Sequence, residues 1–275
     1  MKKRLFISGV VLIWVLVLGL SASSYAGDTQ RTLAAESAVE TIAKRGVIKV
    51  GMDIFVPWAM KDKKGELIGF EIDIAKKLAE DMGVKVEFVP TKWSGIIPGL
   101  IAGKFDVLIG GMTITTKRNM KINFSRPYYY TEQGLMANKK KAAGFKVEDF
   151  NSPSVTIAAR LGSTAAVAAK QRFPKAKIRL FDDEPSAVQE LLNGNVHAMV
   201  SGQPLPSSTA IEYPDTIMVY DEVLMLEAIG IGVRKSDLDT LNLINNWIEI
   251  NRNNRWIQGR YAYWFKSKDW KSLIE

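Results

Sequence analysis

Residues 105–118 have the sequence FDVLIGGMTITTKR, which combines a strand, a glycine turn and the start of a helix. The apolar run at 105–109 predicts a buried strand, and Gly110 and Gly111 let a ligand approach the backbone closely. Thr115 and Thr116 suit the cap of a helix whose first turn holds Arg118. Unpaired N–H groups at a helix start and a guanidinium together fit a carboxylate. On this stretch alone, a strand, a turn and an exposed arginine explain the residues equally well.

The composition is that of a globular protein and excludes several kinds of site. The chain has 275 residues, with 47% hydrophobic and 24% charged, enough for one large domain or two ordinary ones. It has no cysteine and one histidine, His197, which excludes disulfides, thiolate nucleophiles and multi-histidine metal sites. We expect His197 to be structural, and we expect no metal and no cofactor. The net charge of +8 is scattered, which argues against nucleic-acid binding.

The first 26 residues have the three parts of a cleavable signal peptide. Lys2-Lys3-Arg4 form a basic start, residues 5–20 are almost continuously apolar, and Ser24-Tyr25-Ala26 fit a cleavage site. The apolar run is shorter than the roughly 20 residues of a membrane-spanning helix. We therefore expect export to the periplasm and a soluble mature protein that begins near Gly27. An uncleaved anchor is the alternative.

The mature chain repeats one order of strands and helices. Strands are expected at 47–51, 84–89, 105–109, 155–160, 177–181, 197–200 and 227–233, and helices at 70–82, 96–102, 165–172, 185–192, 238–252 and 256–265. The segments 100–111 and 191–202 align without a gap: in each, a helix ends on glycine, a strand follows and a glycine closes it. Two similar α/β lobes are the expected architecture.

Segments spread over residues 40–266 match one pattern. They are Lys49-Val50-Gly51, GELIGFEID at 65–73, WSGIIPGL at 93–100, residues 106–118, Phe124-Ser125-Arg126-Pro127-Tyr128, Arg160-Leu161-Gly162-Ser163-Thr164, Trp247 and Trp264-Phe265. Taken together, they resemble the extracytoplasmic solute-binding proteins of polar amino-acid ABC uptake systems, of the family 3 type.

The resemblance implies a type II periplasmic-binding-protein fold, in which two similar α/β lobes are joined by a two-segment hinge. Lobe 1 would comprise residues 27–129 and 230–275, and lobe 2 residues 130–229, with hinge segments near 128–133 and 226–230. The lobes would close on a ligand in the cleft between them. The implied function is a periplasmic receptor, without catalytic residues, that delivers an amino acid or related small carboxylate to an ABC permease in the inner membrane. We expect a monomer.

The resemblance also implies ligand contacts from lobe 1. Arg118 would bind the α-carboxylate of the ligand, assisted by the Gly111 backbone and the Thr113 hydroxyl. Phe55 and Trp93, in loops at strand ends, would flank the ligand's side chain. A charged hydrogen bond of the kind expected at Arg118 contributes about 1.5–3 kcal/mol.

Lobe 2 would add Arg160 and the backbone of Thr164. Arg160 lies at the end of a strand and could instead pair with Asp182 or Asp183. Among the aromatic residues, Trp58 competes with Phe55 and Trp93 for the place beside the ligand.

One position departs from the family pattern. The last strand of lobe 2 usually ends in an aspartate that receives the ligand's α-ammonium, and Gly202 stands there in this sequence. A buried ammonium without a counter-charge is costly. Either another acid substitutes, or the ligand lacks an α-ammonium, so we expect amine recognition that is atypical or absent. The candidate acids are Asp53, Glu132, Asp221, Glu222 and Glu227.

Two other functions remain open. Cyclohexadienyl dehydratases resemble this family and use the fold to eliminate water from a carboxylated ring. Such an enzyme needs a cleft acid with a raised pKa, for which Glu132 or Glu222 are candidates, and turnover of prephenate distinguishes it. The third function is a ligand-binding partner of a sensory receptor in the membrane.

Overall fold

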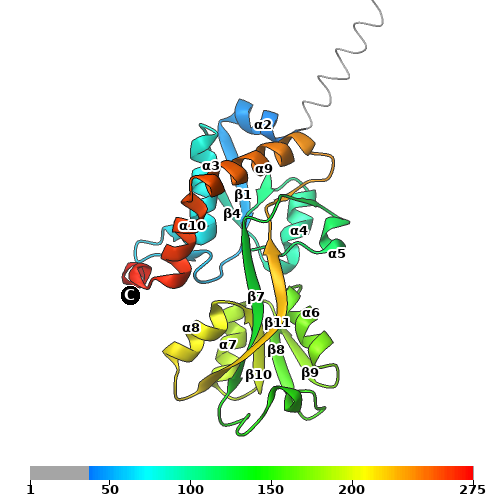
Figure 1. The fold of residues 1–275 in the computed structure, drawn as a ribbon. Coiled ribbons are helices and arrows are strands. Elements are labelled where there is room, and N and C mark those ends of the chain that lie inside the picture. Colours follow the sequence, from blue (N-terminus) through cyan, green and yellow to red (C-terminus); the bar gives the residue numbers. More distant parts are fainter. Residues whose placement is uncertain (1–36, 275) are drawn as a thin grey trace, which may run out of the picture.

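The computed structural model describes residues 37–274, so the expected signal peptide lies outside the described residues. Figure 1 shows two lobes, each built around a sheet covered by helices, with two long strands running from one lobe to the other. This arrangement confirms the expected two-lobed α/β fold. Within residues 37–274, no helix is both long enough and apolar enough to cross a membrane.

The sheet of lobe 1 has the strand order β4-β1-β5-β12-β6. Strand β1 pairs in parallel with β4 and β5, whereas β12, which arrives from late in the chain, runs antiparallel to both β5 and β6. Its strands are β1 (Val47–Met52), β4 (Lys85–Pro90), β5 (Val107–Leu108), β6 (Asn123–Phe124) and β12 (Gly232–Val233), and a separate hairpin pairs β2 (Met60–Lys61) with β3 (Leu67–Ile68).

The helices of lobe 1 come from both ends of the chain. They are α2 (Ala38–Arg45), α3 (Phe70–Asp81), α4 (Trp93–Ile101), α5 (Thr116–Asn119), α9 (Leu238–Asn253) and α10 (Trp256–Tyr261), followed by a π-helical turn (Ala262–Lys266) and a 3-10 turn (Asp269–Leu273). The ring of Phe265 packs against Trp58 at 4.8 Å, Phe70 at 5.2 Å and Tyr129 at 5.4 Å between centroids. This aromatic cluster ties the end of the chain to α3 and to the first crossing strand.

The sheet of lobe 2 has the strand order β11-β7-β10-β8-β9. Its strands are β7 (Tyr129–Asn138), β8 (Thr156–Arg160), β9 (Lys177–Phe181), β10 (Ala198–Gly202) and β11 (Ile217–Ile229), and its helices are α6 (Thr164–Arg172), α7 (Glu184–Leu192) and α8 (Leu205–Glu212), with a 3-10 turn (Val147–Phe150). Strand β8 pairs in parallel with β9 and β10, and β10 pairs antiparallel with β7.

Strands β7 and β11 cross between the lobes as an antiparallel pair (Figure 1). Their pairing runs from Tyr129 opposite Ile229 to Asn138 opposite Ile217, with one irregularity between Tyr220 and Met225. The lobe boundaries at 129/130 and 229/230, and the hinge at 128–133 and 226–230, stay predictions.

Two sequence-based expectations for these elements were wrong. The helix expected at 96–102 begins at Trp93, which places Pro98 inside it, because burial of Trp93, Ile96 and Leu100 outweighs the missing backbone donor. The strand expected at 227–233 is two strands: β11 starts at Ile217, and the chain turns at Gly230 before β12. The first half of β11 was not predicted as a strand, because buried and exposed residues alternate along it and its polar residues are also typical of a loop.

A buried acid in α3, Glu71, should make the stability of the protein depend on pH. Glu71 is 1% exposed and accepts a 2.6 Å hydrogen bond from the Tyr128 hydroxyl. Burial raises the pKa of Glu71 from its ordinary 4.5 to about 8. The folded protein therefore holds a proton that the unfolded chain releases, so this contribution to stability is complete below pH 4.5 and is lost as the pH rises to about 8.

We predict that Glu71→Gln, which cannot titrate, removes part of this pH dependence. Between about pH 5 and about pH 8, the free energy of unfolding of the wild type should fall by up to about 1.4 kcal/mol per pH unit more than that of the variant, and its Tm should fall accordingly. Thermal unfolding followed by circular dichroism measures both proteins. Parallel curves over this range would show that Glu71 is ionised in the folded protein.

Candidate functional site

A small cavity, about 30 Å³ in volume, lies between the two lobes. Residues of lobe 1, lobe 2 and both crossing strands line it. Seven of the eight residues predicted for the site are among them: Phe55, Trp93, Gly111, Thr113, Arg160, Thr164 and Gly202. The eighth, Arg118, lines an adjoining interlobe hollow of about 600 Å³, which it shares with Trp93 and Thr164.

Arg118 is held by both lobes. The Thr115 side chain accepts a 3.2 Å hydrogen bond from the Arg118 backbone, so Thr115 caps α5 as the sequence predicts. The guanidinium is buried and donates to the carbonyl of Thr113 at 2.9 Å and, across the cleft, to that of Gly162 at 3.2 Å. Burial lowers the pKa of Arg118 to about 10, and the Glu227 carboxylate opposes this shift. Arg118 therefore carries a full charge at neutral pH.

The Gly111 backbone brings the main chain against the cavity. Its φ of +69° lies in the left-handed region, and a Cβ there would meet the Trp58 ring at 3.3 Å. Two residues further on, the Thr113 hydroxyl lies 3.3 Å from that of Thr164 in lobe 2. The glycine turn and the two hydroxyls thus meet at the cavity from opposite lobes.

Arg160 lies among aromatic rings and carboxylates. Its guanidinium carbon is 4.3 Å from the ring centroid of Trp93 and 5.3 Å from that of Phe55. Its nitrogens lie 3.4 Å from the Asp53 carboxylate and 3.7 Å from that of Glu184. Burial raises the pKa of both carboxyl groups, and the charge of Arg160 opposes the rise. Arg160 is therefore both a lining residue and an ion-pair partner, joined to lobe 1 through Asp53.

Sequence reasoning named different partners for Arg160 and missed Glu184. Asp182 pairs instead with Lys92, at 3.4 Å. Glu184 is buried at the start of α7, and the Ser201 hydroxyl donates to it at 2.8 Å. The sequence offered one weak signal, an acid directly before Pro185 at a helix start, which also fits an ordinary helix terminus.

The crossing strands contribute two hydrogen-bonded residues, Gln133 and Glu227, whose pairing could not be predicted from the sequence. Gln133 on β7 and Glu227 on β11 are each 4% exposed, and the Gln133 amide donates to Glu227 at 2.7 Å. Both line the cavity. Of the other acids considered for amine recognition, Glu222 pairs with Arg172 at 2.5 Å, Glu132 is half-buried, and Asp221 is exposed.

Aromatic residues line the cavity from the lobe 1 side. Trp93 starts α4 rather than lying in a loop, and its indole N–H donates to the carbonyl of Gly162 at 3.3 Å. Phe55 and Trp58 stack with centroids 6.0 Å apart, and both line the cavity. Trp58 is 2% exposed and also packs in the lobe 1 core, so it backs the site as well as facing it.

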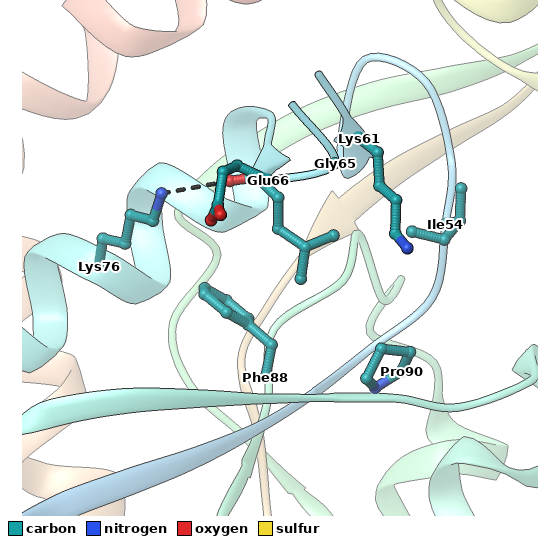
Figure 2. Close-up of a pocket in the computed structure, with 8 residues that line it drawn as sticks. Ile54, Lys61, Gly65, Glu66, Lys76, Phe88 and Pro90 are labelled. Atoms are coloured by element: carbon teal, nitrogen blue, oxygen red, sulfur yellow. Dashed lines mark hydrogen bonds between the residues drawn. The ribbon is translucent and has the colours of Figure 1, made fainter. Parts of the chain in front are cut away.

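His197 and a second hollow lie outside this site. The His197 Nδ1 accepts a 3.1 Å hydrogen bond from the Thr156 backbone, and burial lowers its pKa. A hollow in lobe 1 has a volume of about 550 Å³. Figure 2 shows Lys61, Glu66 and Phe88 among the residues that line it. It contains none of the predicted site residues. Across residues 37–274, no group of three or more acidic or histidine side chains is placed to hold a metal ion.

The chain matches one protein family over most of its length. Residues 48–267 fit the family model of the bacterial extracellular solute-binding proteins, family 3, and the chain belongs to this family. It is therefore a solute-binding protein, the class expected from its sequence.

Similar proteins bind several different amino acids. The L-cystine-binding protein TcyJ of Escherichia coli is 28% identical, over 95% of both chains. An ancestral amino acid-binding protein, AncCDT-1, described as a precursor of cyclohexadienyl dehydratase, is 42% identical over 83% of this chain and 100% of its own, with a TM-score of 0.78. A protein from Wolinella succinogenes, described as a binding component of an ABC transporter and complexed with lysine, is 36% identical over 83% and 99%, with a TM-score of 0.78.

We predict that Gly111→Ala destabilises the protein by about 1–2 kcal/mol, because the left-handed backbone is strained for any residue with a Cβ. Gly95→Ala is the matched control, since a Cβ at this position in α4 meets nothing within 4 Å. Urea unfolding of both variants measures the free energies. Equal stabilities would mean that the turn at Gly111 relaxes without cost.

Proposed function

We propose that the protein is a periplasmic receptor of an ABC uptake system, which binds an amino acid between its lobes and delivers it to an inner-membrane permease. The observation that carries this proposal is the environment of Arg118. Its guanidinium is buried at the cleft, bonded to two carbonyls, and no carboxylate of residues 37–274 lies within 4 Å of it. A buried cation in this position is best satisfied by a carboxylate brought by the ligand.

The roles proposed for the other residues follow from their places around the cavity. The Gly111 backbone, the Thr113 hydroxyl and the Thr164 backbone supply hydrogen bonds to the carboxylate. A pair of charged hydrogen bonds at about 1.5–3 kcal/mol each gives much of the about 8 kcal/mol that a micromolar ligand needs. The rings of Phe55 and Trp93 flank the ligand's side chain, where Arg160 now lies. Gly202, at the end of β10, places no side chain in the cavity that it lines.

Entry of a ligand requires the lobes to separate. The cavity of about 30 Å³ is far smaller than the roughly 300 Å³ or more of ordinary ligand sites. We propose that lobe 1 (27–129 and 230–275) and lobe 2 (130–229) rotate about the crossing strands near 128–133 and 226–230. The protein would act as a monomer, exported by the signal peptide at 1–26.

Replacement of Arg118 by glutamine should abolish binding. We predict a loss of at least about 100-fold in affinity for the L-amino acid that wild-type protein binds most tightly, because two charged hydrogen bonds are removed. Isothermal titration against the standard L-amino acids and L-cystine measures this. Arg126→Gln, at an exposed position of lobe 1, is the matched control and should bind normally. Unchanged affinity in the folded Arg118→Gln variant would contradict the proposed anchor.

AncCDT-1 is itself an amino acid-binding protein, but it is described as a precursor of cyclohexadienyl dehydratase, so this enzyme activity is the second candidate function. The acids that line the cavity are Glu184 and Glu227, rather than Glu132 or Glu222, and burial raises the pKa of Glu184. Glu184 already bonds to Ser201 and pairs with Arg160, so it lacks the freedom of a proton donor.

We therefore predict that the purified protein does not turn over prephenate. Loss of prephenate and formation of the aromatic product, followed by absorbance, test this directly. Turnover that disappears in Glu184→Gln but persists in Glu222→Gln would identify the protein as an enzyme.

A further inference from the structure

Gly202, which stands where the family pattern has an aspartate, has Gln133 as its neighbour on the adjacent strand. In the antiparallel pairing of β10 with β7, Gly202 lies opposite Gln133. A Cβ built on Gly202 would lie 3.5 Å from the Gln133 amide nitrogen, an ordinary van der Waals distance. Any side chain at position 202 would therefore lie directly beside the Gln133 side chain.

Gln133 is in turn bonded to an acid on the other crossing strand. Met225 lies opposite Gln133, and Glu227 lies opposite Thr131, so Gln133 and Glu227 are diagonal neighbours on one face of the strand pair. Their 2.7 Å hydrogen bond uses the Gln133 amide nitrogen and Glu227 Oε2. The other two oxygens, Gln133 Oε1 and Glu227 Oε1, are buried and have no hydrogen-bond partner within the part of the chain that the structure describes.

The charges around the cavity are unevenly paired. Glu184, which lines it, and the nearby Asp53 both lie within 4 Å of the Arg160 guanidinium. Glu227 lines the same cavity but has no cation within 4 Å among residues 37–274. Arg118 is close enough for the Glu227 charge to act on it, yet the two form no direct ion pair.

We propose that Glu227, positioned by Gln133, receives the α-ammonium of the ligand in place of the aspartate missing at 202, so that the ligand is a free α-amino acid. This inference rests on the proposed function. An ammonium has three N–H donors, and the two unpartnered oxygens accept two of them. The carboxylate bonds to Arg118, and the opposite charges of the zwitterion then meet opposite charges of the protein.

This assignment narrows the ligand class. A carboxylic acid without an amino group brings no cation to Glu227, whose carboxylate then stays buried without an opposite charge. Such a ligand should therefore bind more weakly than the corresponding amino acid. It also resolves the alternatives left by the sequence: amine recognition is atypical because it moves from β10 to β11, and it is not absent.

The test compares an amino acid with the same acid lacking its α-amino group. Thermal shift with a panel of L-amino acids that includes L-cystine and L-lysine selects the tightest ligand. Isothermal titration then measures that amino acid and its deaminated analogue (dithiodipropionate for L-cystine, ε-aminocaproate for L-lysine). The proteins are the wild type, Glu227→Gln, the double variant Glu227→Gln with Gly202→Asp, and the control Glu222→Gln, whose acid pairs with Arg172 away from the cavity.

We expect Glu227→Gln to weaken amino-acid binding by about 10- to 100-fold, and to leave the affinity for the analogue nearly unchanged. Glutamine keeps an oxygen for the Gln133 bond but presents an N–H group to the ammonium. The double variant should regain part of the affinity, because the aspartate introduced by Gly202→Asp would restore an acid beside Gln133. Glu222→Gln should bind like the wild type. If Glu227→Gln fails to fold, Gln133→Ala takes its place with the same expected pattern.

Two kinds of result would refute the role of Glu227, and they differ in whether they also refute the proposed function. Unchanged amino-acid affinity in folded Glu227→Gln, or wild-type preference for the deaminated analogue, refutes the role of Glu227 but leaves a carboxylate receptor intact. A wild-type protein that binds neither class refutes the proposed function as well.

Discussion

The antiparallel pairing of β7 with β11 is the constraint on which the rest of the structure depends. These two strands leave the first lobe side by side and form the edge of the second sheet (Figure 1). Every change in the angle between the lobes must be absorbed in their backbone, while their hydrogen bonds keep Gln133 and Glu227 in register. If the lobes rotate about these strands, as proposed, a group bound to Gln133 or Glu227 lies close to the axis of that rotation.

Burial makes the arrangement of charges in the cleft selective. Arg160 is balanced within the protein by Asp53 and Glu184, so it does not demand an external anion. Arg118 has two carbonyls and Glu227 one amide as hydrogen-bond partners, and within residues 37–274 neither has an opposite charge in direct contact. In a low dielectric such groups favour a partner of opposite sign far more than they would in water. The protein thus places a negative group, Glu227, at the small cavity and a positive group, Arg118, at the hollow that adjoins it.

Much of the fold and the local structure around Arg118 could be predicted because local pattern determines them. The strand, glycine pair and capped helix turn around Arg118 are set by neighbours in sequence, and the helix–glycine–strand repeat indicated two lobes. The partners of Arg160 could not be predicted, since Asp53 reaches it from the other lobe and Glu184 from the next helix. Gln133 was missed because an uncharged amide carries no signal until its buried neighbour is known.

The position of Arg160 has a consequence for how tightly anything can bind. Its guanidinium already lies against the faces of Trp93 and Phe55, the rings between which an incoming side chain would lie. If a ligand's side chain lies between these rings, as proposed, it displaces the Arg160 guanidinium, and binding there exchanges one group for another. Arg160 would then compete with the ligand's side chain for the same place between the rings. The affinity of such a ligand would then reflect the difference between its own contacts with the two rings and those that Arg160 gives up. Arg160 would lose less if it kept its ion pairs with Asp53 and Glu184.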